Sequence, residues 1–314
     1  MKKLILLQLF MIMIFSNAFS QIKNDSLGWH VHGFTGINVS QVAVSNWVAG
    51  GDNSYAGSGL FHTTAKYIRS KTYWDNSLEL AYGLIKIEGQ GVRKNDDRIS
   101  FTSNYGRYAF GKFYYSALLT FNTQFAPGYN YPNDTVVVSR FMAPGYLTLG
   151  IGLNWKPVDY FSLFVSPATG KLTFVMDQKL ADVGAYGVDS ATHDANGFKN
   201  KDGQEIKPEF GASLNAQFGK EIFKNIGLAS VLNLFCDYTD KVTSKRANIV
   251  VDWQTGLLMK VNEYVNVSIS TEVIYNDKIP VPLYETINGV KTQVGTGPRT
   301  QFREVLAIGF GYKF

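Results

Sequence analysis

The chain alternates between apolar and polar residues over most of its length, and this alternation predicts β-strands. In residues 113–125, Phe113, Tyr115 and Leu119 fall on one face of the predicted strand, whereas Ser116 and Thr120 fall on the other. A period of two is typical of a strand, because successive side chains point to opposite faces. The pattern predicts twelve strands, at residues 29–40, 54–68, 74–84, 98–105, 113–125, 147–155, 161–165, 210–218, 232–238, 249–257, 265–275 and 306–314.

The connections between these runs alternate between short and long. The short ones fall at 69–72, 109–112, 156–160, 219–225 and 260–264. The longer ones fall at 41–53, 86–97, 127–143, 167–206, 239–246 and 277–300. Tight turns at one end and larger loops at the other are typical of an outer-membrane barrel, with the short turns in the periplasm. A soluble β-sandwich has no reason to alternate in this way.

Composition supports an all-β membrane protein. Charged residues make up only 18% and aromatic residues 14%, which excludes a disordered chain. The mean hydropathy of −0.07 and the lack of an apolar run of about 18 residues exclude a bundle of transmembrane helices. We therefore predict an all-β fold: a transmembrane antiparallel up-and-down β-barrel of about twelve strands, with short periplasmic turns and long extracellular loops.

The two ends of the chain carry signals that agree with this location. Residues 1–20 combine Lys2 and Lys3 with an apolar stretch and a small-x-small pattern ending at Ser20, which predicts a secretory signal peptide cleaved near Ser20. Residues 21–314 then form one barrel domain in the outer membrane of a Gram-negative cell. Without Lys2 and Lys3 the formal net charge falls from +5 to +3, so we expect no nucleic-acid partner.

The C-terminal run ends on alternating aromatic residues, namely Phe310, Tyr312 and Phe314. Such an ending resembles the signal that the barrel-assembly machinery reads, so we expect that machinery and outer-membrane lipid as partners. A terminal strand of a soluble sandwich gives a similar pattern, and the signal peptide favours the barrel.

Polar and charged residues on the inward face predict a polar network in the lumen. Its predicted members are His30, His32, His62, Lys66, Glu79, Arg98, Asp252, Glu272 and Arg303. A salt-bridged, hydrated lumen is favoured over a selective or catalytic site, because ionisable groups at membrane depth need partners or water. Pairing the first two strands around Trp47 places His32 opposite His62. Such imidazoles suit a transition metal or a proton shuttle, although a structural role is favoured.

Two loop segments are candidates for a plug or a docking surface. The first contains Asn46, Trp47, Gly50 and Gly51. The second contains Pro167, Gly170 and Lys171, unless the seventh strand continues past Pro167 to Phe174. Long loops in a compact domain are usually functional or disordered, and the apolar and glycine content here favours ordered packing.

Several short motifs resemble an uncharacterised family of Bacteroidetes outer-membrane barrels, known as a domain of unknown function. They are Asn46-Trp47-x-x-Gly50-Gly51, Lys94-x-Asp96-Asp97, Ser166-Pro167-x-x-Gly170-Lys171-Leu172-Thr173 and Phe310-x-Tyr312-Lys313-Phe314. The resemblance covers nearly all of the chain after the signal peptide. It implies an outer-membrane location but no activity, substrate or catalytic residue.

Three hypotheses for function follow. The first is a non-enzymatic barrel that is structural or an accessory, docking subunit of an envelope complex, with an envelope protein as partner. The second is a narrow passive channel for small solutes. The third is an enzyme acting on lipid or peptide, which is disfavoured because no H-E-x-x-H, G-x-S-x-G or P-loop motif occurs. We expect no catalytic residues, no bound metal and no cofactor.

Overall fold

The computed structural model describes residues 27–42, 53–131, 133–262, 264–287 and 290–313. The predicted signal peptide, the predicted loop residues Asn46, Trp47, Gly50 and Gly51, and the terminal Phe314 lie outside the described residues. No helix in the described ranges has the length and apolar character needed to cross a membrane.

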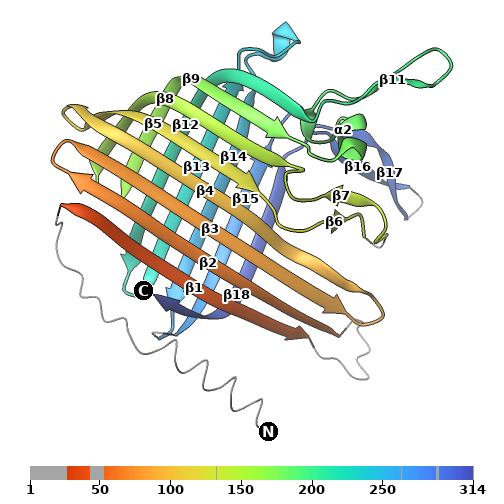
Figure 1. Cartoon of the computed structure of the whole chain (residues 1–314). Helices are drawn as coiled ribbons and strands as arrows, with labels where there is room; N and C mark the ends of the chain where they lie inside the picture. The colour runs from red at the N-terminus through yellow and green to blue at the C-terminus, as the bar shows by residue number, and fades with distance from the viewer. Residues whose placement is uncertain (1–26, 43–52, 132, 263, 288–289, 314) are drawn as a thin grey trace, which may run out of the picture.

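Twelve long strands form a closed antiparallel barrel (Figure 1). Around the wall their order is β1, β18, β15, β14, β13, β12, β9, β8, β5, β4, β3 and β2. Their bounds are β1 Gly28–Val42, β2 Ser54–Arg69, β3 Thr72–Ile87, β4 Val92–Phe110, β5 Phe113–Thr123, β8 Gly145–Val158, β9 Phe161–Phe174, β12 Ile206–Phe223, β13 Ile226–Asp237, β14 Ile249–Lys260, β15 Val265–Tyr275 and β18 Gln301–Lys313. The predicted fold class is confirmed.

The alternation in the sequence becomes the two faces of the wall. Trp29, Val31, Ile37 and Val39 of β1 are 53–67% exposed on the outer face. His30 pairs directly with Lys66 of β2, so the even-numbered residues of both strands share one face of the wall. This is the face opposite Trp29 and Val31, and it lines the lumen. Closure of the barrel pairs most backbone groups and removes the edges of the sheet.

The two ends of the barrel differ as predicted. Short turns join β2 to β3, β4 to β5, β8 to β9, β12 to β13 and β14 to β15, and this short-turn end also holds the start of β1 and the end of β18. The opposite, loop end carries small extra elements (Figure 1). These are β6 Gly128–Tyr129, β7 Val137–Ser139, α2 Gln178–Asp182, η1 Ala185–Gly187, β10 Thr192–His193, β11 Lys199–Lys201, η2 Thr243–Lys245, β16 Val281–Ile287 and β17 Val290–Gly297.

Two expectations about the loops are wrong. Residues 86–97 are not a long loop. β3 continues to Ile87 and β4 begins at Val92, so only a four-residue turn joins them. The polar residues 92–97 belong to β4. A register shift beside Gly83 of β3 accommodates the one extra residue that β4 has at this point.

The second correction concerns Pro167, Gly170 and Lys171, which lie within β9 and not in a loop. The alternative that the seventh strand continues to Phe174 is the one the structure adopts. A bulge at 166–168 explains why the strand tolerates a proline, since proline cannot donate to the ladder and is confined to edges and bulges.

Candidate functional site

Ion pairs between inward-facing side chains cross the lumen in its loop-end half. Arg303 Nη2 of β18 lies 3.2 Å from Asp96 Oδ1 of β4, and Arg303 Nη1 lies 3.8 Å from Glu272 Oε2 of β15. Three strands, β3, β2 and β1, separate β4 from β18 around the wall. The Arg303 side chain therefore bridges two distant parts of the barrel and narrows the passage between them.

A second set of charges lies next to this bridge. Glu79 Oε1 of β3 forms an ion pair with Arg98 Nη2 at 3.0 Å, and Glu79 Oε2 lies 3.6 Å from His62 Nδ1. These three side chains are 31–38% exposed, so they face a hydrated space. Opposite them, Asp252 accepts hydrogen bonds from Asn233 at 3.4 Å and from Gln254 at 3.2 Å.

The structure brings together six of the nine residues predicted to form the lumen network, namely His62, Glu79, Arg98, Asp252, Glu272 and Arg303. His30, His32 and Lys66 face the same lumen but lie nearer the short-turn end. Asp96 was not among the predicted residues, because residues 86–97 were expected to form a loop, although Asp96 lies on the same face of β4 as Arg98 two residues later.

The predicted pairing of His32 with His62 is wrong. His32 lies opposite Thr64, and His62 lies opposite Phe34, because the two strands pair around a centre one residue later than Trp47. His62 is engaged with Glu79. Within the described ranges no group of three or more His, Cys, Asp or Glu side chains is arranged to hold a metal ion.

Loop segments form an ordered cap at the loop end. Val175, Leu180, Ala181 and Val188 are buried together with Ala143 in a small apolar core. The helix α2 that carries Leu180 begins after Asp177, whose carboxylate accepts hydrogen bonds from the first backbone N–H groups of the helix. The cap is thus a folded unit with its own core and not a loose loop.

The cap lies over inward-facing side chains of the wall. Tyr186 Oη donates to the carbonyl of Val138 at 2.6 Å, and Lys207 Nζ of β12 donates to the carbonyl of Gly187 at 2.6 Å. Gly187 also lies against Lys278 in the loop that follows β15. Residues 184–188 therefore cover part of the mouth of the barrel.

Hydrogen bonds also hold the outer part of the cap. Asp182 accepts from Lys199 Nζ at 2.8 Å and from the backbone N–H of Gly203 at 2.9 Å. These contacts, with Lys199 the largest, lower the pKa of Asp182 to about 2. The β10–β11 hairpin, which contains the exposed Phe198, is anchored to α2 in this way.

A buried cluster of charges, here called the Lys278 node, fastens the loops after β13 and β15 to the wall, directly beside Gly187 of the cap. Lys278 Nζ contacts Glu209 at 2.7 Å, Asp237 at 2.5 Å and Asp240 at 3.2 Å. The other oxygen of Glu209 lies 3.0 Å from Lys171 of β9. The side chains of these five residues are at most 14% exposed.

Within the Lys278 node, the surroundings of Lys278 and Asp240 favour the ionised forms of both side chains. Burial alone would lower the pKa of Lys278, but the hydrogen bonds that Lys278 donates to Asp237 and Glu209 outweigh burial and raise its pKa above its ordinary value. For Asp240, burial would raise the pKa, but the Val242 N–H and Lys278 hold it below its ordinary value. Lys278 and Asp240 lie in loops without alternation, so sequence reasoning missed them.

Tyr73 is the centre of a separate polar network at the short-turn end of the lumen. Its hydroxyl lies 3.2 Å from Asn104 Oδ1, 2.8 Å from Ser116 Oγ and 2.6 Å from Asn154 Nδ2. Its ring lies directly over Gly106, where a Cβ atom would come within 2.2 Å. One side chain of β3 thus ties together β4, β5 and β8.

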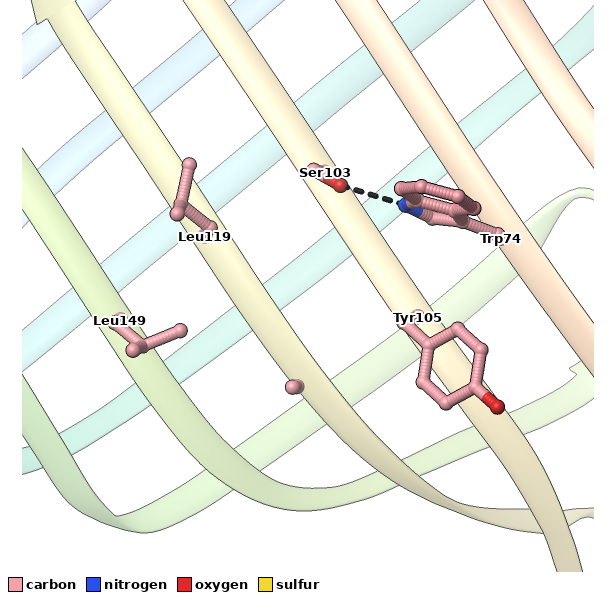
Figure 2. A pocket seen from close by; sticks show the side chains of 6 residues that line it. Trp74, Ser103, Tyr105, Leu119 and Leu149 are labelled. Carbon is pink, nitrogen blue, oxygen red and sulfur yellow. Dashed lines mark hydrogen bonds between the residues drawn. The ribbon is translucent and has the colours of Figure 1, made fainter.

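The outer face of the barrel is largely apolar, and several of its polar side chains are hydrogen-bonded to one another. Trp74 Nε1 donates to Ser103 Oγ at 2.8 Å, and Ser103 Oγ donates to Asn76 Oδ1 at 2.8 Å. Figure 2 shows the first of these bonds beside the apolar side chains of Leu119 and Leu149. On the other side of the barrel, Trp253 Nε1 donates to Ser230 Oγ at 2.9 Å.

Large apolar side chains cover the rest of this face, with exposed fractions of 37–65% on β5, β8 and β9 alone. Examples are Tyr115, Leu149, Ile151, Leu153 and Val165. Such an apolar belt suits a hydrocarbon environment, and the N–H groups of Trp74 and Trp253 are satisfied there, where an unpaired polar group costs several kcal/mol. Fold and outer face together define a closed β-barrel of the kind that spans membranes.

Comparison with known proteins adds a partial family match. Residues 39–129 match the family described as "Protein of unknown function (DUF3078)", which covers less than a third of the chain. A search of curated proteins found no match.

Solved barrel structures resemble the chain only distantly. The translocator domain of the autotransporter NalP from Neisseria meningitidis is 9% identical, with 93% of this chain and 91% of that chain covered and a TM-score of 0.38. An outer-membrane channel from Pseudomonas putida F1 is 10% identical, with 95% and 100% covered and a TM-score of 0.38. The NanC porin is 9% identical, with 90% and 100% covered and a TM-score of 0.35.

Proposed function

We propose that the protein is a non-enzymatic outer-membrane barrel that serves as a structural or docking subunit of an envelope complex. The observation that carries the proposal is the ordered cap, which is packed around its own core and hydrogen-bonded to the wall through Lys207 of β12 and the carbonyl of Gly187. A passive pore has no need of a folded, anchored structure over its mouth. The apolar outer face supports the membrane location, and the loop end is then external.

The outer surface of the cap offers a place for a protein partner. Val183 and Phe198 are 75% and 73% exposed, and Phe141 is 55% exposed. Apolar side chains that are held in place by ordered structure are typical of the centres of protein interfaces, because little conformational freedom is lost on binding. An envelope protein with a complementary apolar surface is the partner that this cap fits.

The docking proposal is tested by crosslinking and pull-down from native membranes in gentle detergent. We expect a partner protein to be recovered with the unaltered chain and to decrease about tenfold with a V183S/F198S double variant, a loss of ~1.4 kcal/mol of binding free energy. The matched control is Val261→Ser, because Val261 is 65% exposed at the short-turn end, away from the cap. Recovery of the barrel alone, or equal recovery with all three proteins, would contradict the proposal.

A narrow channel is the second candidate, favoured by the partly exposed Glu79, Arg98 and His62 in the lumen. Planar-bilayer conductance separates the two functions. Under the docking proposal the intact chain gives no current steps, because the cap and the Arg303 bridge obstruct the passage. A variant in which residues 176–204 are replaced by a short Gly-Ser linker and Arg303 by alanine should conduct. Steady current steps from the intact chain would establish the channel instead.

A further inference from the structure

Two arginines face outward at the short-turn end of the barrel wall. The register places Arg69 of β2 opposite Thr72 of β3, and Thr72 opposite Arg107 of β4. Trp74 and Tyr105, two residues away along β3 and β4, are 41% and 47% exposed on the outer face. Alternation therefore turns the whole row outward, and both arginines are exposed. We call Arg69, Thr72 and Arg107 the arginine row.

The positive charge of the arginine row is not neutralised within the described part of the chain. Every arginine–carboxylate pair among the described residues involves another arginine. Asp75, the nearest carboxylate along β3, faces the lumen, where Lys156 Nζ binds it at 2.8 Å. The two adjoining turns add the exposed Lys71 and Lys112 and no acidic residue, and Asp159 lies beyond β5 and β8 in the turn after β8.

The spacing of the arginine row suits a phosphate group. Neighbouring strands lie about 4.8 Å apart, so the Cα atoms of Arg69 and Arg107 are roughly 10 Å apart across β3. Both guanidinium groups are carried on long side chains and can reach one phosphate over Thr72, whose hydroxyl is a further donor. Guanidinium groups bind phosphate oxygens through paired, charge-assisted hydrogen bonds.

An apolar hollow on the outer face begins beside the arginine row (Figure 2). It has a volume of about 280 Å³ and is lined by Trp74, Ser103, Tyr105, Ala117, Leu119 and Leu149. Ala117 lies between Tyr105 and Ile151 in the register, and its small side chain leaves space between these larger neighbours. The N–H group of Trp74 is satisfied by Ser103 Oγ at 2.8 Å, so the hollow suits a hydrocarbon chain.

Aromatic side chains indicate that this part of the wall lies at a membrane–water interface. Trp29 contacts Tyr67 and Trp74, with ring centroids 5.3 and 5.6 Å apart. Tryptophan and tyrosine are enriched at the level of lipid headgroups. Successive outward residues of a strand are about 7 Å apart, so the hollow begins one such step from the arginine row. With the short turns in the periplasm, the row lies at the surface of the periplasmic leaflet and the hollow lies within it.

We propose that the arginine row and the hollow together bind an anionic glycerophospholipid of the periplasmic leaflet, represented by phosphatidylglycerol. The phosphate lies over Thr72 between Arg69 and Arg107, and one acyl chain lies in the hollow along Ala117. The positive charge of the row disfavours the ammonium group of phosphatidylethanolamine. This binding site goes beyond the docking function and rests only on the proposed membrane location and orientation.

The test reconstitutes the protein in phosphatidylcholine bilayers that contain phosphatidylglycerol with a photoreactive acyl chain, and labelled residues are mapped by mass spectrometry. We expect Leu119 and Leu149 to be labelled in the unaltered chain and about tenfold less in the R69Q/R107Q variant. The matched control is K224Q/K260Q, which removes the same charge from exposed positions at the same end of the barrel, on β12 to β14. This control should keep the labelling.

Headgroup preference is measured with phosphatidylethanolamine that carries the same photoreactive chain. At Leu149 we expect about tenfold less labelling with this lipid than with phosphatidylglycerol. A second hollow on the outer face provides an internal control, because its lining, which includes Ile37, Phe61 and Leu80, contains no basic residue. The two lipids should label Leu80 equally. The same ratio of labelling at Leu149 and Leu80 would overturn the anionic preference.

Unchanged labelling of Leu119 and Leu149 in R69Q/R107Q, or an equal decrease in K224Q/K260Q, would overturn the localised site. Displacement of the label by the same concentration of water-soluble glycerol phosphate would identify a site for free anions and overturn the lipid assignment. Failure of the membrane location is distinguishable, because the outward-facing Ile308, which is 61% exposed, would then remain unlabelled by either lipid in every variant. The docking function is read separately, from recovery of the partner protein.

Discussion

Replacing Lys278 with methionine is expected to destabilise the cap and its attachment by about 3–5 kcal/mol, the usual cost of removing one partner from a buried set of charges. Glu209, Asp237 and Asp240 would keep their negative charges with less compensation, and each is at most 9% exposed. We expect limited proteolysis to cut the 276–300 loop and the cap much faster in the variant. The barrel wall should remain folded.

The matched control is Lys241→Met. Lys241 pairs with Asp189, but the two side chains are 80% and 41% exposed, so the loss should be below about 1 kcal/mol. Equal proteolysis of the Lys278 and Lys241 variants would show that the Lys278 node does not hold the cap.

The Lys278 node also implies a definite pH range over which the cap is most stable. The lowered pKa of Asp240 adds stability above its ordinary pKa, near 4, and this is lost as the pH falls through the lowered value. The raised pKa of Lys278 adds stability below its ordinary pKa, near 10, and this is lost as the pH rises through the raised value. Resistance of the cap to proteolysis should therefore form a plateau between about pH 4 and pH 10.

Replacing Gly106 with valine is expected to destabilise the barrel wall strongly. The new Cβ would lie 2.2 Å from the Tyr73 ring, so the ring must move and its hydroxyl must leave Asn104, Ser116 and Asn154. Overpacking costs about 1–3 kcal/mol, and several buried hydrogen bonds are broken as well. Together these should lower the free energy of unfolding by at least ~3 kcal/mol. Urea unfolding, followed by tryptophan fluorescence in detergent micelles, measures it.

Gly256→Val provides the control. Gly256 also faces the lumen from a strand, but no atom lies within 4 Å of the position of its Cβ. Its replacement should change stability little. If a Y73A background leaves the cost of Gly106→Val unchanged, contact between Tyr73 and Gly106 is not the cause of the instability.

The strands and the faces of the wall could be predicted from the sequence because alternation is a local property. Each inward position, from His62 to Arg303, follows from its neighbours two residues away. Contacts across the lumen could not be predicted, because they depend on how far the wall curves between the strands. Arg303 and Asp96 meet although three strands separate them along the sheet.

Register and loop packing were also beyond local reasoning. The centre of the β1–β2 hairpin was misplaced by one residue, which moved the expected partner of His62 from Phe34 to His32. The Lys278 node joins residues from β9, β12, β13 and two loops, and no periodic pattern links them.

The bulge around Pro167 reverses which residues of β9 face the lumen. Before it, even-numbered residues such as Phe164 and Ser166 face the lumen; after it, odd-numbered residues such as Thr169 and Lys171 do so. One extra residue thus decides that the ammonium group of Lys171 meets Glu209 and not hydrocarbon, where a lysine at the midplane costs about 2–4 kcal/mol. Attachment of the cap therefore depends on the length of the strand as much as on its composition.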